Sequence, residues 1–147
     1  PCITKKISTL IGAIIIVLAT MLMGAIVSKS GSSLACDIWP LCSNDGVSIF
    51  QHNKIIHLSH RILAIISTIF VFLIVNFYKD VVQYKIIFVL RNILISLIIL
   101  QILIGATVIF TELNLFIAML HQAIAVILFI VLSFLFWFTL QSNFKRN

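Results

Sequence analysis

Four long stretches with at most one charged residue each constrain the fold of this chain more than any other feature. They are Ile7–Val27, Ile55–Phe77, Ile86–Phe110 and Leu113–Leu140. An α-helix rises about 1.5 Å per residue, so each stretch can cross about 30 Å of hydrocarbon. The whole chain is 62% hydrophobic and 10% charged, with a mean hydropathy of +1.24, unlike a soluble domain. The sequence therefore predicts an all-α polytopic membrane protein, a single domain of residues 1–147 folded as an antiparallel four-helix transmembrane bundle in a lipid bilayer.

The positions of the basic residues predict the orientation of this bundle. The net charge is +6, but the charge lies next to the apolar stretches and does not suggest a nucleic-acid partner. Basic residues occur at Lys5–Lys6, between positions 79 and 91, and at Lys145–Arg146. The positive-inside rule places these regions and both termini in the cytoplasm. The loop Ser28–Lys54 and the turn Thr111–Asn114 are then expected on the outer side.

The outer loop contains a pair of cysteines and a tryptophan. Cys36 and Cys42 lie close in sequence, with Pro40 between them, on the predicted oxidising side of the membrane. We expect a disulfide between them, and two free or metal-binding thiols are the alternative. Trp39 is expected near the membrane interface.

Two histidines lie at similar depths inside two of the apolar stretches. His60 is about 8 Å and His121 about 12 Å from the predicted outer ends of their stretches. Imidazoles are costly in hydrocarbon and are seldom left there without a partner. A pair at one depth, with the small residues Ala64, Ala118 and Ala125 one turn away, predicts a haem iron held between two helices. The alternative is a pair of histidines that only form hydrogen bonds between helices.

Other polar residues extend this cluster. His57 lies one turn nearer the outside than His60. Arg61 is charged within an apolar stretch, so we expect either an anionic partner, such as the haem propionates, or extension to the interface. The ring nitrogen of His121 that does not bind iron needs a partner, either a backbone carbonyl or a polar side chain such as Gln101. His52 is expected to be a solvated loop residue.

Several of these segments together resemble the haem A synthases. The matching segments occur in the order found in that family: Gly24–Val27, Ser30–Ser32, Leu34–Cys36, Trp39–Cys42, His60–Arg61, Gln101–Val108 and His121. The combination of Trp-Pro-Leu-Cys, His-Arg and Gln-x-x-x-Gly is more specific than any single segment. The resemblance covers nearly the whole chain.

The resemblance implies a membrane oxidoreductase that converts a methyl group of haem O into the formyl group of haem A by successive hydroxylations. By motif, His60 and His121 would be the axial ligands of a haem b iron, Arg61 would contact the haem, and Cys36 and Cys42 would be the outer-loop pair. Haem O would be the substrate, with haem O synthase or oxidase assembly proteins as partners. The location would be a bacterial or archaeal cell membrane or the mitochondrial inner membrane.

Three positions depart from the family pattern. Family members usually have a glutamate, tied to activity, three positions before the first ligand, where this chain has His57. Ser28 replaces an arginine, and Asp37–Ile38 replaces Pro-Asp. We expect His57 to occupy the catalytic position, while haem binding survives these changes more easily than catalysis. The alternative functions are a non-enzymatic haem b protein for electron transfer or oxidase assembly, and a haem-free subunit.

The family commonly has eight helices in two similar halves, and this chain contains one four-helix unit. It is expected to be either a compact member that forms a homo-oligomer or one half of a longer protein. The first residue, Pro1, favours a trimmed chain or a fragment.

Overall fold

The structure, a computed structural model, describes residues 2–36, 38–39, 42, 52–79 and 85–144. These residues form four helices, α1 (Cys2–Lys29), α2 (His52–Phe77), α3 (Lys85–Phe110) and α4 (Leu115–Phe144). Each helix contains a segment long and apolar enough to cross a membrane. The predicted all-α membrane fold is therefore confirmed, and the described residues contain no strand.

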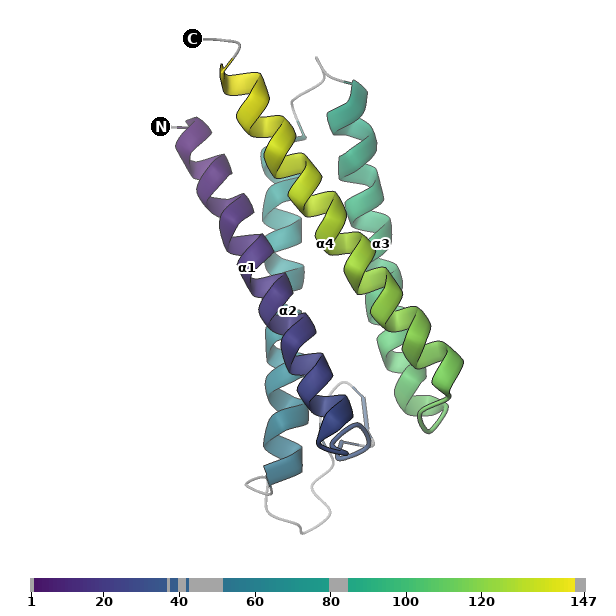
Figure 1. The fold of residues 1–147 in the computed structure, drawn as a ribbon. Helices are drawn as coiled ribbons and strands as arrows, with labels where there is room; N and C mark the ends of the chain where they lie inside the picture. Colours follow the sequence, from purple (N-terminus) through teal and green to yellow (C-terminus); the bar gives the residue numbers. More distant parts are fainter. Residues whose placement is uncertain (1, 37, 40–41, 43–51, 80–84, 145–147) are drawn as a thin grey trace.

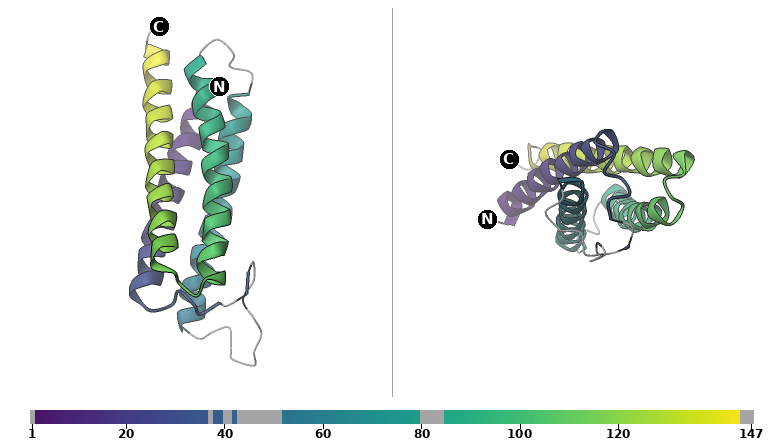
Figure 2. Two further views of the ribbon diagram at one scale, coloured as in Figure 1. Left: turned by 90° about the vertical axis from the view of Figure 1, so that its right-hand side faces the viewer. Right: turned by 90° about the horizontal axis from the view of Figure 1, so that it is seen from below.

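The helices lie side by side in an elongated bundle (Figures 1 and 2). The start of α1 and the end of α4 lie at one end of the bundle, which we call the terminal end. The turn after α1, the start of α2 and the connection from α3 to α4 lie at the opposite end, the loop end. Because α1 packs mainly on α2 and α3 mainly on α4, the bundle consists of two helix pairs.

The helices extend beyond the predicted apolar stretches. α2 begins at His52, so the prediction that His52 and Lys54 belong to the outer loop is wrong. His52 is exposed, whereas Lys54 is buried. Helical hydrogen bonds join backbone groups and do not require apolar side chains, so a helix can continue past the hydrocarbon region. Trp39 is exposed, while Pro40 and the basic pair Lys145–Arg146 lie outside the described residues.

The start of α4 is set by an N-cap. The side-chain Oδ1 of Asn114 accepts hydrogen bonds from the backbone N–H groups of Phe116 at 3.1 Å and Ile117 at 3.3 Å. These donors have no carbonyl partner inside the helix, so the cap satisfies them. α4 therefore begins at Leu115 and not at Leu113 as the apolar pattern suggested.

The ends of α1 and α3 have the same local geometry. In each, a backbone N–H donates to the carbonyl five residues earlier, Ser32 to Val27 at 3.1 Å and Leu113 to Val108 at 3.0 Å. The residue before each donor has a positive φ, 69° at Gly31 and 51° at Glu112. This is the Schellman arrangement, which satisfies carbonyls at a helix end.

The two helix pairs also share a sequence pattern. Thr20–Val27 reads TMLMGAIV and Gln101–Val108 reads QILIGATV, an offset of 81 residues. Along α2 and α4 the buried positions correspond with an offset of 61 residues: Ser67 and Leu128, Val71 and Leu132, Ile74 and Leu135, Tyr78 and Thr139. The pairs α1–α2 and α3–α4 are therefore two versions of one packing unit.

The continuous buried core lies toward the terminal end. Its members are Leu10, Ala13 and Val17 of α1, Val71, Ile74 and Tyr78 at and after α2, Ile87, Leu90, Leu94 and Ile98 of α3, and Leu128, Leu132 and Leu135 of α4. In lipid, close packing and hydrogen bonds between helices stabilise such a bundle, because the lipid tails are as apolar as the core. The loop-end half contains the buried polar residues Ser32, Lys54 and His57.

A buried hydrogen bond joins two corresponding positions of the helix pairs at the terminal end. The hydroxyl of Thr139 donates to the carbonyl of Leu135 at 2.7 Å, so the Tyr78 hydroxyl is the donor in its 2.6 Å contact with Thr139 Oγ1. Burial raises the pKa of the Tyr78 phenol, and the bond to Thr139 opposes this only in part. Lys6 Nζ lies 5.0 Å from the centroid of the Tyr78 ring.

Candidate functional site

His60 is held between a glycine and a backbone carbonyl of α1. Its Nδ1 lies 3.1 Å from the carbonyl oxygen of Thr20. A Cβ atom on Gly24 would lie 3.1 Å from Cε1 of the ring, so glycine permits this close approach. Because a carbonyl can only accept a hydrogen bond, Nδ1 carries the hydrogen and Nε2 keeps its lone pair. The ring is therefore held in the tautomer that can bind a metal through Nε2.

Thr20 also connects His60 to a second hydrogen bond. The Thr20 hydroxyl donates to the carbonyl of Ile16 at 2.7 Å, so the buried Ser67 hydroxyl donates to Thr20 Oγ1 at 2.8 Å. This bond links α1 and α2 on the terminal-end side of the His60 contact (Figure 1). It stabilises the helix pair at the level where the imidazole is held.

His121 lies in the corresponding place between α4 and α3. A Cβ atom on Gly105 would lie 2.9 Å from Cε1 of this ring. The side-chain Nε2 of Gln101 lies 3.3 Å from His121 Nε2. The buried His121 Nδ1 and Gln101 Oε1 each form no hydrogen bond among the described residues.

The two histidines share one layer of the bundle. His60 is eight residues after the start of α2 and His121 is six residues after the start of α4, which corresponds to about 12 Å and about 9 Å along the helices. Both helices start at the loop end (Figure 1).

This donor set fits a haem. Within the described ranges, no three His, Cys, Asp or Glu side chains come together as a metal-binding group. A haem supplies four nitrogen ligands of its own and needs only axial ligands from the protein. His60 presents an Nε2 lone pair, and the His121 ring lies in the corresponding place of the other helix pair, against Gly105 as His60 lies against Gly24. This paired arrangement fits axial ligation by two histidines.

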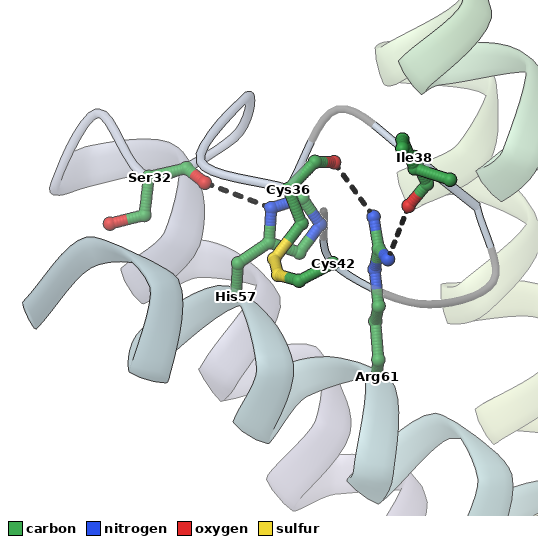
Figure 3. The surroundings of a disulfide bond; sticks show 6 residues. All are labelled: Ser32, Cys36, Ile38, Cys42, His57 and Arg61. Carbon is green, nitrogen blue, oxygen red and sulfur yellow. Dashed lines mark hydrogen bonds between the residues drawn. A yellow bond between two sulfur atoms is a disulfide. The ribbon is translucent and has the colours of Figure 1, made fainter. Parts of the chain in front are cut away.

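His57 and Arg61 attach the loop after α1 to the side of α2 (Figure 3). His57 is buried, and its Nδ1 donates to the carbonyl of Ser32 at 3.0 Å. The guanidinium of Arg61 donates to the carbonyls of Ile38 at 2.8 Å and Cys36 at 2.9 Å. The sequence predicted either an anionic partner for Arg61 or extension of its side chain to the interface. The structure shows two of its N–H groups bonded to backbone carbonyls of the loop.

The two loop cysteines meet beside His57. The sulfur atoms of Cys36 and Cys42 are in contact, and the Cα atoms are 4.6 Å apart, a separation that suits a disulfide (Figure 3). Cys36 is fully buried. Since Arg61 holds the carbonyl of Cys36, the cysteine pair is tied to the turn of α2 that carries His60.

The sequence interpretation missed the closest neighbours of the two histidines. It assigned shallow surfaces to Ala64, Ala118 and Ala125, whereas Gly24 and Gly105 of the neighbouring helices lie against the rings. The repeated pattern Leu-x-Gly-Ala-x-Val was the available signal. His52, which was expected to be solvated, stays apart from the site at the exposed start of α2.

Comparison with known proteins identifies the family of the chain. The profile of a family described as cytochrome oxidase assembly protein matches residues 4–133. A haem A synthase of Oceanobacillus iheyensis is 38% identical over 115 residues, covering 76% of this chain and 37% of that protein. The haem A synthase of Staphylococcus carnosus is 39% identical over 121 residues, covering 82% and 39%. That of Geobacillus thermodenitrificans is 32% identical over 138 residues, covering 90% and 42%.

The chain thus spans about two fifths of the length of these curated relatives. Its four apolar helices and its bacterial relatives identify an integral, multi-pass protein of a bacterial membrane. Because the matched profile runs from the first turns of α1 into α4, the chain belongs to the cytochrome oxidase assembly family that includes the haem A synthases.

Proposed function

We propose that this chain acts in haem A biosynthesis and holds a haem b between His60 and His121. The observation that carries the proposal is the paired arrangement of the two rings, each against a glycine of the neighbouring helix and both in one layer. When bound, haem b would supply an iron that accepts and releases one electron. The relatives named haem A synthase support the choice of pathway.

The protein groups around the rings would position the two ligands. The carbonyl of Thr20 fixes the His60 tautomer, and the absence of side chains at Gly24 and Gly105 lets both helices approach the rings. Partner groups on the other ring nitrogen orient metal-bound histidines and affect affinity. We propose that Arg61, which holds the loop, also contacts a haem propionate.

The reaction that we propose for the assembled enzyme is oxidation of a methyl group of haem O to the formyl group of haem A. Converting a methyl group to a formyl group is a four-electron oxidation. With dioxygen as the oxidant, the methyl group and O2 give the formyl group and one water. A histidine pair that occupies both axial positions serves electron transfer, so the substrate needs a second site. We therefore propose that this four-helix unit works with a second unit, either another copy or a further half.

The loop after α1 would cover the haem at the outer side. We propose that Cys36 and Cys42 form a lasting disulfide, and that His57 and Arg61 keep the closed loop against α2. His57 stands at the position where the family usually has a carboxylate, and we propose that it serves there in proton transfer. Haem O synthase and oxidase assembly proteins are the partners that this function requires.

A non-enzymatic haem b protein for electron transfer or oxidase assembly is the second candidate. The contact between His57 and the Ser32 carbonyl favours it, because this position has no fixed negative charge and its Nδ1–H is already used by the loop. Such a protein would bind haem b and pass electrons without changing haem O. Both candidate functions predict the same optical spectrum. They differ in whether haem O is converted into a hydroxylated or formyl product.

Optical spectra of the purified chain test the haem site. We expect a six-coordinate low-spin spectrum that His60→Ala and His121→Ala each abolish, while the control His52→Ala keeps it because His52 is exposed at the start of α2. Wild-type haem content and spectrum in both ligand variants would refute the assignment. Supplying haem O and extracting the pigments for mass spectrometry then separates the candidates, since only the enzyme yields hydroxylated or formyl product.

A further inference from the structure

The two candidate ligands have equivalent backbone surroundings but different hydrogen-bond partners. Thr20 and Gln101 each lie four residues before the glycine that contacts the ring. Cε1 is the ring atom closest to the glycine in both cases. The comparison therefore isolates one difference: the side chain of Gln101 contacts its imidazole, whereas the side chain of Thr20 bonds to Ile16 and Ser67.

At His60 the partner is fixed, and it leaves the metal-binding nitrogen open. The carbonyl of Thr20 belongs to the backbone of α1 and contacts Nδ1. A helix carbonyl cannot move away without a change in the helix itself. His60 Nε2 forms no hydrogen bond with the described residues and is ready to bind iron.

At His121 the partner is a side chain, and it stands at the opposite nitrogen. Gln101 Nε2 is 3.3 Å from His121 Nε2. Either orientation of the amide occupies this nitrogen: the NH₂ group would donate to its lone pair, and the oxygen would accept from its hydrogen. Gln101 Oε1 and His121 Nδ1 are both buried without a hydrogen bond in the described part of the chain, so the contact leaves polar atoms unsatisfied.

We propose that Gln101 is a positioning residue that competes with iron for Nε2 of His121, so that His60 is the permanent ligand and His121 the exchangeable one. This inference rests on the proposed function, because it requires haem between the two histidines. The glutamine amide keeps the free imidazole in place and turns away when iron binds. A neutral hydrogen bond of this kind lowers the apparent affinity of His121 for iron by about two- to twelvefold.

Substitutions on α3 provide the test. Gln101→Leu removes the amide and keeps much of the side-chain volume. Thr107→Val is the control on the same helix, because Thr107 is exposed and its hydroxyl donates to the Leu103 carbonyl of its own helix. Gln101→Ala is a second variant that guards against a packing defect specific to leucine. Each purified chain is titrated with haem b, and the reduced form is then titrated with carbon monoxide, which binds where an axial ligand has left.

We expect Gln101→Leu and Gln101→Ala to bind haem about two- to twelvefold more tightly than the wild type and to bind less carbon monoxide at equal haem loading. Thr107→Val should match the wild type in both haem affinity and carbon monoxide binding. A purely structural role for Gln101 would instead weaken haem binding in both variants and leave the carbon monoxide titration unchanged.

The outcomes separate this inference from the proposed function. A wild-type chain that binds no haem between His60 and His121 would refute both. A wild type with the six-coordinate spectrum, together with Gln101 variants whose carbon monoxide binding is unchanged or increased, would refute only the competition at His121.

Discussion

Gly105 lies so close to His121 that a Cβ atom on the glycine would be 2.9 Å from Cε1 of the imidazole. The corresponding distance from Gly24 to His60 Cε1 is 3.1 Å. Carbon atoms of a methyl group and a ring do not normally approach within 3 Å, so α3 and α4 can keep this contact only with glycine at position 105.

Gly105→Ala should therefore displace the His121 ring and reduce haem binding more than Gly24→Ala does. Overpacking of this kind typically costs about 1–3 kcal/mol. Haem content and the low-spin spectrum of the purified variants measure the effect. Gly12→Ala is a control with similar crowding away from the site, since its Cβ would lie 2.7 Å from Phe70 Cε1. Equal haem loss in the Gly12 and Gly105 variants would show that general packing, and not the His121 contact, is responsible.

Loss of the bidentate contact at Arg61 should loosen the cysteine loop. Arg61→Lys replaces a planar group that reaches two carbonyls with a single ammonium. In the wild type we expect both Cys36 and Cys42 to resist alkylation until reductant is added, and the variant to be reduced several times faster. Intact-mass measurement after timed reduction gives both rates. Free alkylation of both thiols in oxidised wild type would contradict the disulfide.

Introducing a carboxylate at position 57 should test the departure from the family pattern. We expect His57→Glu to raise the yield of hydroxylated or formyl product from haem O without changing the low-spin spectrum. His57→Gln is the control, because it keeps an N–H donor for the Ser32 carbonyl but adds no charge. If the glutamate variant gives no more product than the glutamine variant at equal haem loading, His57 does not replace that carboxylate.

Removal of the Tyr78 hydroxyl should affect stability and leave the haem site intact. Tyr78→Phe deletes a buried hydrogen bond to Thr139 and should cost about 1 kcal/mol. Because the folded-state pKa of Tyr78 is raised, its contribution is complete below about pH 10, the pKa of a free tyrosine, and is lost as the pH rises through the folded value. Thermal unfolding measured at pH 8 and at a higher pH should show that the rise in pH destabilises Tyr78→Phe less than it destabilises the wild type. An equal pH dependence in both proteins would exclude Tyr78 as the source.

The orientation in the membrane can be tested from the two ends of the bundle. In a Cys2→Ser background, Glu112→Cys at the loop end and Lys79→Cys at the terminal end both introduce an exposed thiol. We expect a membrane-impermeant maleimide to label position 112 in intact cells and position 79 only after permeabilisation. The reverse pattern would overturn the placement of the termini in the cytoplasm.

The membrane helices were largely predictable because their causes are local. Apolar length is a property of consecutive residues, and it indicated four spans whose cores agree with α1 to α4. The ends were less accurate, since polar residues such as His52 continue a helix and the Asn114 cap moves the start of α4. These ends depend on hydrogen bonds that hydropathy does not report.

The sequence by itself determined that the chain crosses a membrane and that His60 and His121 lie at comparable depth, because both follow from counting along a helix. Only the tertiary structure decided which atoms face those histidines. Gly24 and Gly105 come from other helices, and the Thr20 carbonyl and the Gln101 amide differ although their positions correspond. It also directed Arg61 to loop carbonyls. Contacts between helices depend on helix rotation and packing, which the spacing of residues in one helix does not fix.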